Sequence, residues 1–196
     1  MTPEEAIKAF VEASITIEDF EKIIYSDQAI EALLRLEKEL PAYIAEPDLY
    51  TYVISQNYRN TGAISNTQTL LSEFLLRKSI KHNVNEKYRK LFELTLDVQP
   101  KWLDLPSEYF TQSIEGKENL KPKELKIYLK EKIKTDFWFL KTAPKWLQAP
   151  AWPIHDGHPL IFAGQIDISG LAHDSSQLYI FFDDRNGEFT NITQSC

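Results

Sequence analysis

The sequence predicts an α+β fold, in which a helical amino-terminal region packs on a mostly antiparallel sheet that ends in a hairpin. Helical periodicity with capping signals fills the first two thirds of the chain, and β-rich runs fill the last third. Asn186-Gly187, a dipeptide typical of tight turns, lies between the last two of these runs. We therefore expect one domain over residues 1–196, mainly helical over 1–134 and mainly β over 135–196.

Capping signals predict three helices near the amino terminus. Thr2-Pro3-Glu4-Glu5 has the pattern of a capping box with proline in the first turn, so a helix is expected to begin there. Thr16 is expected to precede a second helix, and Ser26 to cap a third that Pro41 ends. Apolar residues recur at helical spacing in all three segments: Ile7, Phe10 and Val11; Phe20, Ile23 and Ile24; Ile30, Leu33, Leu34 and Leu40.

The middle of the chain mixes both kinds of pattern. Residues 49–54 are rich in β-branched and aromatic side chains, which predicts a strand, and the polar, glycine-containing residues 56–62 are expected to end it. Later segments return to helical spacing before a short aromatic run. The expected elements are helices after Asn66 or Thr67, after Asn85 up to Pro100, and after Pro122, and a strand-like segment over 137–140.

The last third carries the strand signals. Asp156-Gly157 lies in a proline-rich loop and predicts a turn that leads into an apolar strand within residues 160–168. Two further strands are expected over 178–182 and 189–193, with Asn186-Gly187 in the connection, because both residues tolerate positive φ. These three strands form the expected antiparallel sheet.

Two tryptophans lie in matching segments that are bounded by prolines. Residues 100–106 and 144–150 share the pattern Pro-Lys-Trp-Leu-x-x-Pro, around Trp102 and Trp146. Proline limits the backbone on either side, and a tryptophan ring has a large apolar surface to bury. We favour two corners that anchor the core, and a pair of ligand-stacking rings stays open as the alternative.

Charge is distributed unevenly along the chain. Residues 1–50 hold 12 acidic and 4 basic side chains, residues 51–150 hold 11 and 17, and residues 151–196 hold 6 and 1. Phosphate binding requires clustered lysine and arginine, so nucleic acid is not expected as a partner of either end. The lysine-rich stretch 117–134 also contains three glutamates and is best interpreted as a solvated helix face.

Composition favours a cytoplasmic protein with a substantial core. The chain is 43% hydrophobic, and no stretch approaches the roughly 20 apolar residues of a membrane span. The acidic amino terminus is unlike a signal peptide, so we expect neither export nor a membrane partner. Cys196 is the only cysteine, which excludes an internal disulfide.

Catalytic patterns are missing from the sequence. There is no P-loop, no dinucleotide-binding fingerprint and no serine nucleophile elbow, and six glycines leave little for a phosphate cradle. His155-x-x-His158, with Asp156, Asp174 or Asp183 nearby, is the one constellation that could build a metal site, and we favour surface histidines at a turn. We therefore expect no enzyme, no metal and no cofactor; a metal-dependent hydrolase that uses His155 and His158 remains the alternative.

A family resemblance rests on the last third. It is carried by Trp152-Pro153, by Gly157-x-Pro159-Leu160-x-Phe162-x-x-Gln165-Ile166 and by Leu178-Tyr179-x-Phe181-Phe182. These segments resemble the YwqG-like family, and the whole chain resembles small bacterial immunity proteins encoded beside polymorphic toxins, including those of contact-dependent growth inhibition. The resemblance implies protein binding and brings no catalytic residue.

The resemblance and the acidity together suggest an immunity protein that binds a cationic toxin domain and occludes its active site. An acidic surface would complement such a partner and speed the encounter. A housekeeping binding module of unknown ligand is the other open alternative, and the acidic amino-terminal helices are the rival surface. The expected contact residues lie on the carboxy-terminal sheet and its turns: Asp156, Asp174, Tyr179, Asp183, Asp184 and Glu188. Trp152 could add an aromatic anchor, although we favour core packing for it.

Overall fold

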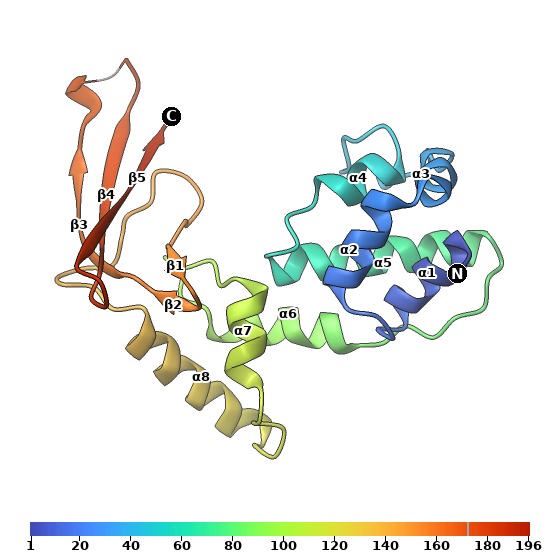
Figure 1. Ribbon diagram of the computed structural model, residues 1–196, viewed down its shortest axis with the longest axis horizontal. Helices are drawn as coiled ribbons and strands as arrows, with labels where there is room; N and C mark the ends of the chain where they lie inside the picture. Colours follow the sequence, from blue (N-terminus) through green and yellow to red (C-terminus); the bar gives the residue numbers. More distant parts are fainter. Residues whose placement is uncertain (172) are drawn as a thin grey trace. The chain divides into compact units, whose positions relative to one another are not determined.

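The computed structural model describes residues 1–171 and 173–196 and has an α+β fold (Figure 1). The predicted fold class and the predicted carboxy-terminal hairpin are confirmed. The chain divides into two compact units, Met1–Leu94 and Thr95–Cys196. The single domain over residues 1–196 therefore stays a prediction, and the helices that share a unit with the sheet are the later ones.

The first unit is helical, and two of its helices begin where the capping signals predict. The Thr2 hydroxyl accepts a hydrogen bond from the Glu5 amide and the Glu5 carboxylate accepts one from the Thr2 amide, which completes the capping box. Thr16 caps the second helix. The elements are α1 (Pro3–Val11), α2 (Ile17–Ser26), α3 (Gln28–Arg35), α4 (Leu49–Ser55), α5 (Thr61–Arg77) and α6 (Lys87–Val98), the last of which continues into the second unit.

The strand expected over residues 49–54 is wrong, because this segment is α4. The Asp48 carboxylate accepts a hydrogen bond of 2.7 Å from the Thr51 amide and so caps the helix. Leu49 and Val53, one turn apart, are fully buried. A weak β preference of the side chains is thus outweighed by a cap and by burial of one helical face.

Two other helix starts also differ from expectation. α3 is capped by Asp27 and not by Ser26, and it ends at Arg35, well before Pro41. α5 begins at Thr61 and not after Asn66 or Thr67. The Asn60 side chain caps it by accepting hydrogen bonds from the amides of Gly62 and Ala63. Gly62 then lies in the first turn of α5, where a Cβ atom would come within 2.9 Å of the Phe92 ring. That close approach, and not a loop, explains the glycine.

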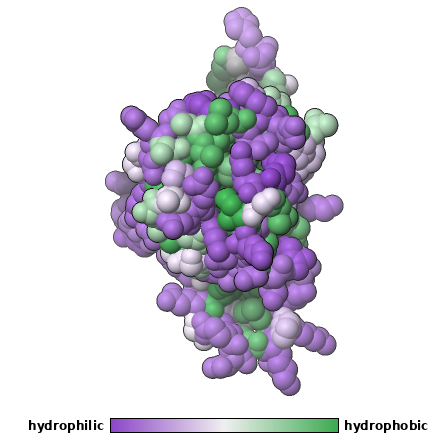
Figure 2. All heavy atoms as spheres, turned by 90° about the vertical axis from the view of Figure 1, so that its right-hand side faces the viewer, coloured by the Kyte–Doolittle hydropathy of each residue, from purple (hydrophilic) through white to green (hydrophobic). Residues whose placement is uncertain are grey.

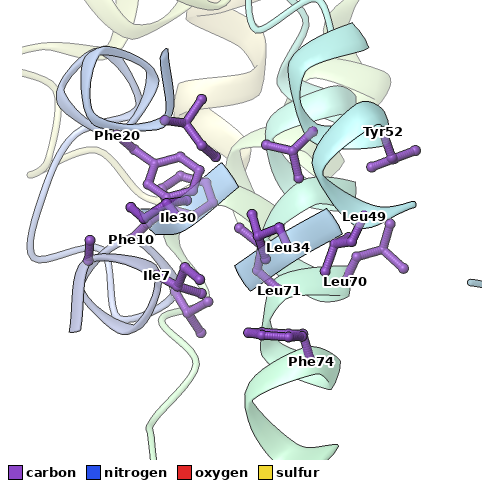
Figure 3. Close-up of a cluster of buried hydrophobic side chains, with 14 of the residues drawn as sticks. Ile7, Phe10, Phe20, Ile30, Leu34, Leu49, Tyr52, Leu70, Leu71 and Phe74 are labelled. Atoms are coloured by element: carbon purple, nitrogen blue, oxygen red, sulfur yellow. The ribbon is translucent and has the colours of Figure 1, made fainter. Parts of the chain in front are cut away.

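The core of the first unit lies among α1 to α5 (Figure 3). The rings of Phe10 and Phe20 stack with their centroids 4.3 Å apart. Buried Gln68 on α5 donates hydrogen bonds to the backbone carbonyls of Val11, at 2.8 Å, and Asn85, at 2.9 Å. Figure 2 shows a face on which hydrophilic residues predominate and hydrophobic residues form smaller areas between them.

The second unit combines two helices with the strands. The Tyr109 hydroxyl donates a hydrogen bond of 2.7 Å to the Asp136 carboxylate, which also pairs with Lys132, and so joins α7 to α8. Burial, followed by this carboxylate, raises the pKa of Tyr109. The elements are α7 (Ser107–Ile114), α8 (Pro122–Asp136), β1 (Ile154–His155), β2 (His158–Pro159), β3 (Ile161–Asp167), the short 3₁₀ helix η1 (Ser169–Leu171), β4 (Ser176–Asp183) and β5 (Glu188–Ser195).

The strands form two antiparallel sheets. β1 pairs with β2 across a two-residue turn, in which Asp156 and Gly157 both have positive φ, as an Asp-Gly turn of this kind requires. β3, β4 and β5 form the second sheet in chain order, with an irregularity between Phe162 and Gly164 in β3. The residues 137–140 are not a full strand: they make one parallel bridge, between Phe139 and Phe162.

The two tryptophan corners meet inside the second unit. The Trp146 indole nitrogen donates a hydrogen bond of 2.8 Å to the Trp102 carbonyl. Trp152, the tryptophan before the β1–β2 hairpin, is buried, and its ring lies 5.4 Å from those of Trp102 and Phe181. Core packing is thus confirmed for Trp152, and the two Pro-Lys-Trp-Leu segments are joined by the Trp146–Trp102 hydrogen bond.

Candidate protein-binding surface

One face of the β3–β4–β5 sheet is apolar and partly exposed, and we call it the outer face. Strand register places its residues opposite one another: Phe182 of β4 pairs with Ile161 of β3 and with Phe189 of β5. The Phe182 and Phe189 rings lie 5.1 Å apart, which confirms that they share a face. Ile166 is 51% exposed and Phe189 is 64% exposed. The outer face consists of Ile161, Ile166, Leu178, Ile180, Phe182 and Phe189.

The opposite face of the same sheet is packed, and we call it the inner face. Phe162, Tyr179 and Phe181 lie on it and are buried, with the Trp146 ring 4.5 Å from the Tyr179 ring. The Tyr179 hydroxyl accepts a hydrogen bond from the Leu147 amide at 2.7 Å and donates one to the Lys145 carbonyl at 3.0 Å. Tyr179 thus holds the chain before β1 against the sheet.

A second inner-face side chain continues this brace. The Gln194 side-chain oxygen accepts hydrogen bonds from the amides of Leu147, at 3.0 Å, and Gln148, at 2.9 Å, and its nitrogen donates to the Ala149 carbonyl at 2.8 Å. Gln194 is buried, so these backbone groups find their partners in the protein and not in water. The inner face is therefore committed to the fold, and only the outer face is free to meet a partner.

The turns of the two hairpins lie next to each other at one end of the sheet. His155 Nδ1 lies 3.7 Å from an Asp183 carboxylate oxygen, and His158 Nε2 lies 3.5 Å from an Asp184 carboxylate oxygen. Arg185 contacts both oxygens of Asp183, through Nε at 2.9 Å and a terminal nitrogen at 2.7 Å. His155 and His158, the two histidines of the possible metal site, thus join the β1–β2 hairpin to Asp183 and Asp184 at the end of β4.

Asp183 is an internal partner of Arg185 and not a surface charge. Its side chain is buried, and the Arg185 guanidinium holds the pKa of its carboxyl well below the usual range. The proposed contact surface therefore loses Asp183. The β4–β5 connection is also longer than a two-residue turn: Asp183 pairs with Glu188, and Gly187, with a φ of +76°, closes a four-residue loop.

The other expected contact residues separate into two groups. Tyr179 is fully buried, so it too leaves the proposed contact surface. Asp156, Asp174, Asp184 and Glu188 are exposed. Asp174 precedes β4 and Asp184 follows it, so the two carboxylates lie at opposite ends of the sheet, while Asp156 and Glu188 belong to the same end as Asp184. The predicted residues thus border the sheet at two ends and do not form one cluster.

Sequence reasoning missed the outer face, although a signal for it exists. In β4, Leu178, Ile180 and Phe182 alternate with Tyr179 and Phe181, so both faces of the strand are apolar. Apolar residues on both faces are typical of a strand that is covered on both sides. In β4 the inner-face residues Tyr179 and Phe181 are buried, whereas Leu178, Ile180 and Phe182 on the outer face are only half-buried.

Comparison with known protein families, curated proteins and solved structures found no match to this chain. Residues 1–171 and 173–196 contain no group of three or more histidine, cysteine, aspartate or glutamate side chains that could hold a metal ion. Nor does any helix in the described part of the chain have the length and apolarity needed to cross a membrane.

Proposed function

We propose that this protein is a bacterial immunity protein, which binds a cationic toxin domain in the cytoplasm and occludes its active site. The observation that supports the proposal is the apolar outer face, on which Ile166 and Phe189 are exposed and the other members half-buried, bordered by acidic residues at the ends of its strands. Contiguous exposed apolar surface on a folded protein marks a binding site. The resemblance of the whole chain to small bacterial immunity proteins, in which such YwqG-like carboxy-terminal segments occur, suggests the same class of function.

The outer face has the composition of an interface centre. Aromatic side chains are enriched where protein interfaces bury most of their area, and charged ones are depleted there. The Phe182 and Phe189 rings contact each other at a tilt on the outer face, and the neighbouring strand positions Gly164, Asn191 and Thr193 are uncharged. A partner that covers this face would bury the two rings, which we expect to dominate the affinity.

The acidic border supplies the charge that a cationic toxin domain requires. Asp184 and Glu188 are exposed in the β4–β5 loop and at its edge, and Arg185, the one basic side chain of residues 151–196, is bound to Asp183. The loop therefore presents carboxylates while its cation is engaged. Charges at the rim of an interface act mainly on the rate of association and on its dependence on salt.

The test uses the toxin domain that a neighbouring gene is expected to encode. Co-expression of the full chain with that domain should restore growth, and the two purified proteins should form a complex. Replacing Phe189 and Ile166 by serine should weaken binding by roughly 2 kcal/mol or more, as expected for truncated anchors. Ile127→Ser is the control, because Ile127 is an equally exposed isoleucine on α8 (57%) that belongs to no strand. Equal binding by the outer-face variant and the control would refute the proposed surface.

The charges are tested separately by their effect on rates. The double variant Asp184→Lys/Glu188→Lys should associate on the order of tenfold more slowly at low salt, with a reduced salt dependence. Glu115→Lys/Glu131→Lys reverses the same number of exposed charges elsewhere in the second unit. If instead reversal of Glu18 on α2 abolished binding, the interface would lie on the rival amino-terminal helices.

A further inference from the structure

A pocket of about 500 Å³ lies within the second unit, and none of its lining residues belongs to the outer face. It is formed by the end of α6, the residues that follow it, one side of α8 and the segment after α8. A pocket of this volume is in the range that small molecules occupy in proteins. Its lining is Val98, Pro100, Trp102, Lys130, Ile133, Lys134, Phe137, Trp138 and Phe139.

The walls of the pocket are apolar and largely aromatic. The Trp102 and Phe139 rings meet edge to face with centroids 5.8 Å apart, and the lining residues Ile133 and Phe137 are buried. Trp138 is 52% exposed, so a large ring stands in contact with solvent at the pocket. Such a lining favours the apolar body of a ligand and offers it few hydrogen bonds.

Two lysines supply the only charges of the lining. Lys130 and Lys134 are one helical turn apart on α8, and neither makes an ion pair among the described residues. Their neighbours on the same helix are paired: Lys126 with Asp97, and Lys132 with Asp136. Like charges at this spacing repel each other. An anion placed between Lys130 and Lys134 would offset that repulsion.

We propose that this pocket binds a small amphipathic carboxylate, such as a medium-chain fatty acid. The hydrocarbon chain contacts Trp102, Trp138 and Phe139, and the carboxylate lies at Lys130 and Lys134. Charge complementarity selects an anion over a cation or an alcohol with the same chain. This assignment is independent of the proposed immunity function, because it uses no residue of the outer face.

A fluorescent fatty acid tests the proposal on the full chain. Dansyl-labelled undecanoate, kept below its micelle concentration, should accept energy from the pocket tryptophans when it binds. Dodecanoate should displace it, and dodecyltrimethylammonium should not. Decanoate should bind less tightly than dodecanoate by about fourfold for each methylene group removed. Equal displacement by the cationic detergent, or no energy transfer at any concentration, would overturn the proposal.

Charge reversal locates the carboxylate. Lys130→Glu/Lys134→Glu should weaken dodecanoate binding about tenfold or more, since two attractions become repulsions. Lys123→Glu/Lys141→Glu is the matched control, because both residues are exposed in the same unit and neither lines the pocket. The neutral pair Lys130→Gln/Lys134→Gln keeps the helix propensity and should show an intermediate loss. Equal weakening by the control and the pocket variant would remove the two lysines from the site.

Discussion

Replacing Tyr179 by phenylalanine removes one oxygen atom from the inner face and leaves the ring in place. That oxygen makes two hydrogen bonds, with the Leu147 amide and the Lys145 carbonyl. The amide keeps a second partner in Gln194, at 3.0 Å, and the carbonyl keeps a longer bond from Gln165, at 3.3 Å. Neither group is left without a partner, so the loss should be that of two ordinary hydrogen bonds, about 1–2 kcal/mol in the free energy of unfolding.

Tryptophan fluorescence measures this loss in the second unit alone. All four tryptophans of the chain, Trp102, Trp138, Trp146 and Trp152, lie in Thr95–Cys196. With an m-value of about 1.5 kcal/mol per molar urea, Tyr179→Phe should lower the unfolding midpoint by about 1 M. Tyr128→Phe is the control, since the Tyr128 hydroxyl makes no hydrogen bond among the described residues.

A double-mutant cycle sharpens the prediction. Gln194→Leu removes the second partner of the Leu147 amide, so in the double variant this amide has lost both partners. The combined loss should exceed the sum of the single losses by more than about 0.5 kcal/mol, because a part-buried amide left without any protein partner costs more than one lost hydrogen bond. Strict additivity, or a Tyr179→Phe variant as stable as the wild type, would refute the brace that we describe for the inner face.

Three further predictions follow from the two units. Asp183→Asn should destabilise the second unit at neutral pH and make its stability less dependent on acid. The Arg185 guanidinium lowers the pKa of Asp183 in the folded state, so the stabilisation from this carboxylate is present above the unfolded-state pKa of about 4 and is lost as the pH falls below that value. Urea unfolding measured from pH 7 to pH 2 should show the difference between the two proteins. Gly157→Ala should cost about 1 kcal/mol in thermal unfolding, because Gly157 has a φ of +74°, whereas Gly164→Ala, where a methyl group meets nothing within 4 Å, should cost far less. Gln68→Leu should destabilise the first unit by about 1–2 kcal/mol, measured by the helical circular dichroism signal during unfolding, since it removes the two hydrogen bonds from Gln68 to the Val11 and Asn85 carbonyls.

Local signals predicted those elements that depend on a few neighbouring residues. The capping box at Thr2, the cap at Thr16 and the proline start of α8 are set by side chains within one turn, and each lies where the pattern places it. The Asp156-Gly157 turn is also determined locally, because few pairs of adjacent residues both adopt a positive φ. α7 was missed, since Pro106 precedes it without a side-chain cap.

Long-range packing decided the elements that sequence reasoning placed wrongly. Residues 49–54 have side chains that suit a strand, and they become α4 because Asp48 caps them and Leu49 and Val53 fill the helical core. Burial also reassigned two candidate contact residues. Nothing in the sequence separates Asp183 from exposed Asp184, or Tyr179 from the half-buried residues beside it. Strand register, the Arg185 contact and the course of residues 145–149 place both side chains inside.

The apolar outer face limits the concentration at which the free protein stays monomeric in the absence of its partner. An apolar strand surface such as Ile166 and Phe189, left uncovered, can meet the same surface of another copy, and β5 adds an edge that pairs only with β4 in the described residues. Self-association rises with concentration, so an excess of the free chain should be held in reversible assemblies that a partner dissolves. Under the proposed function, synthesis of toxin and immunity protein in equal amounts would then have two effects in the producing cell. The toxin would be neutralised, and the immunity protein would be kept from self-association.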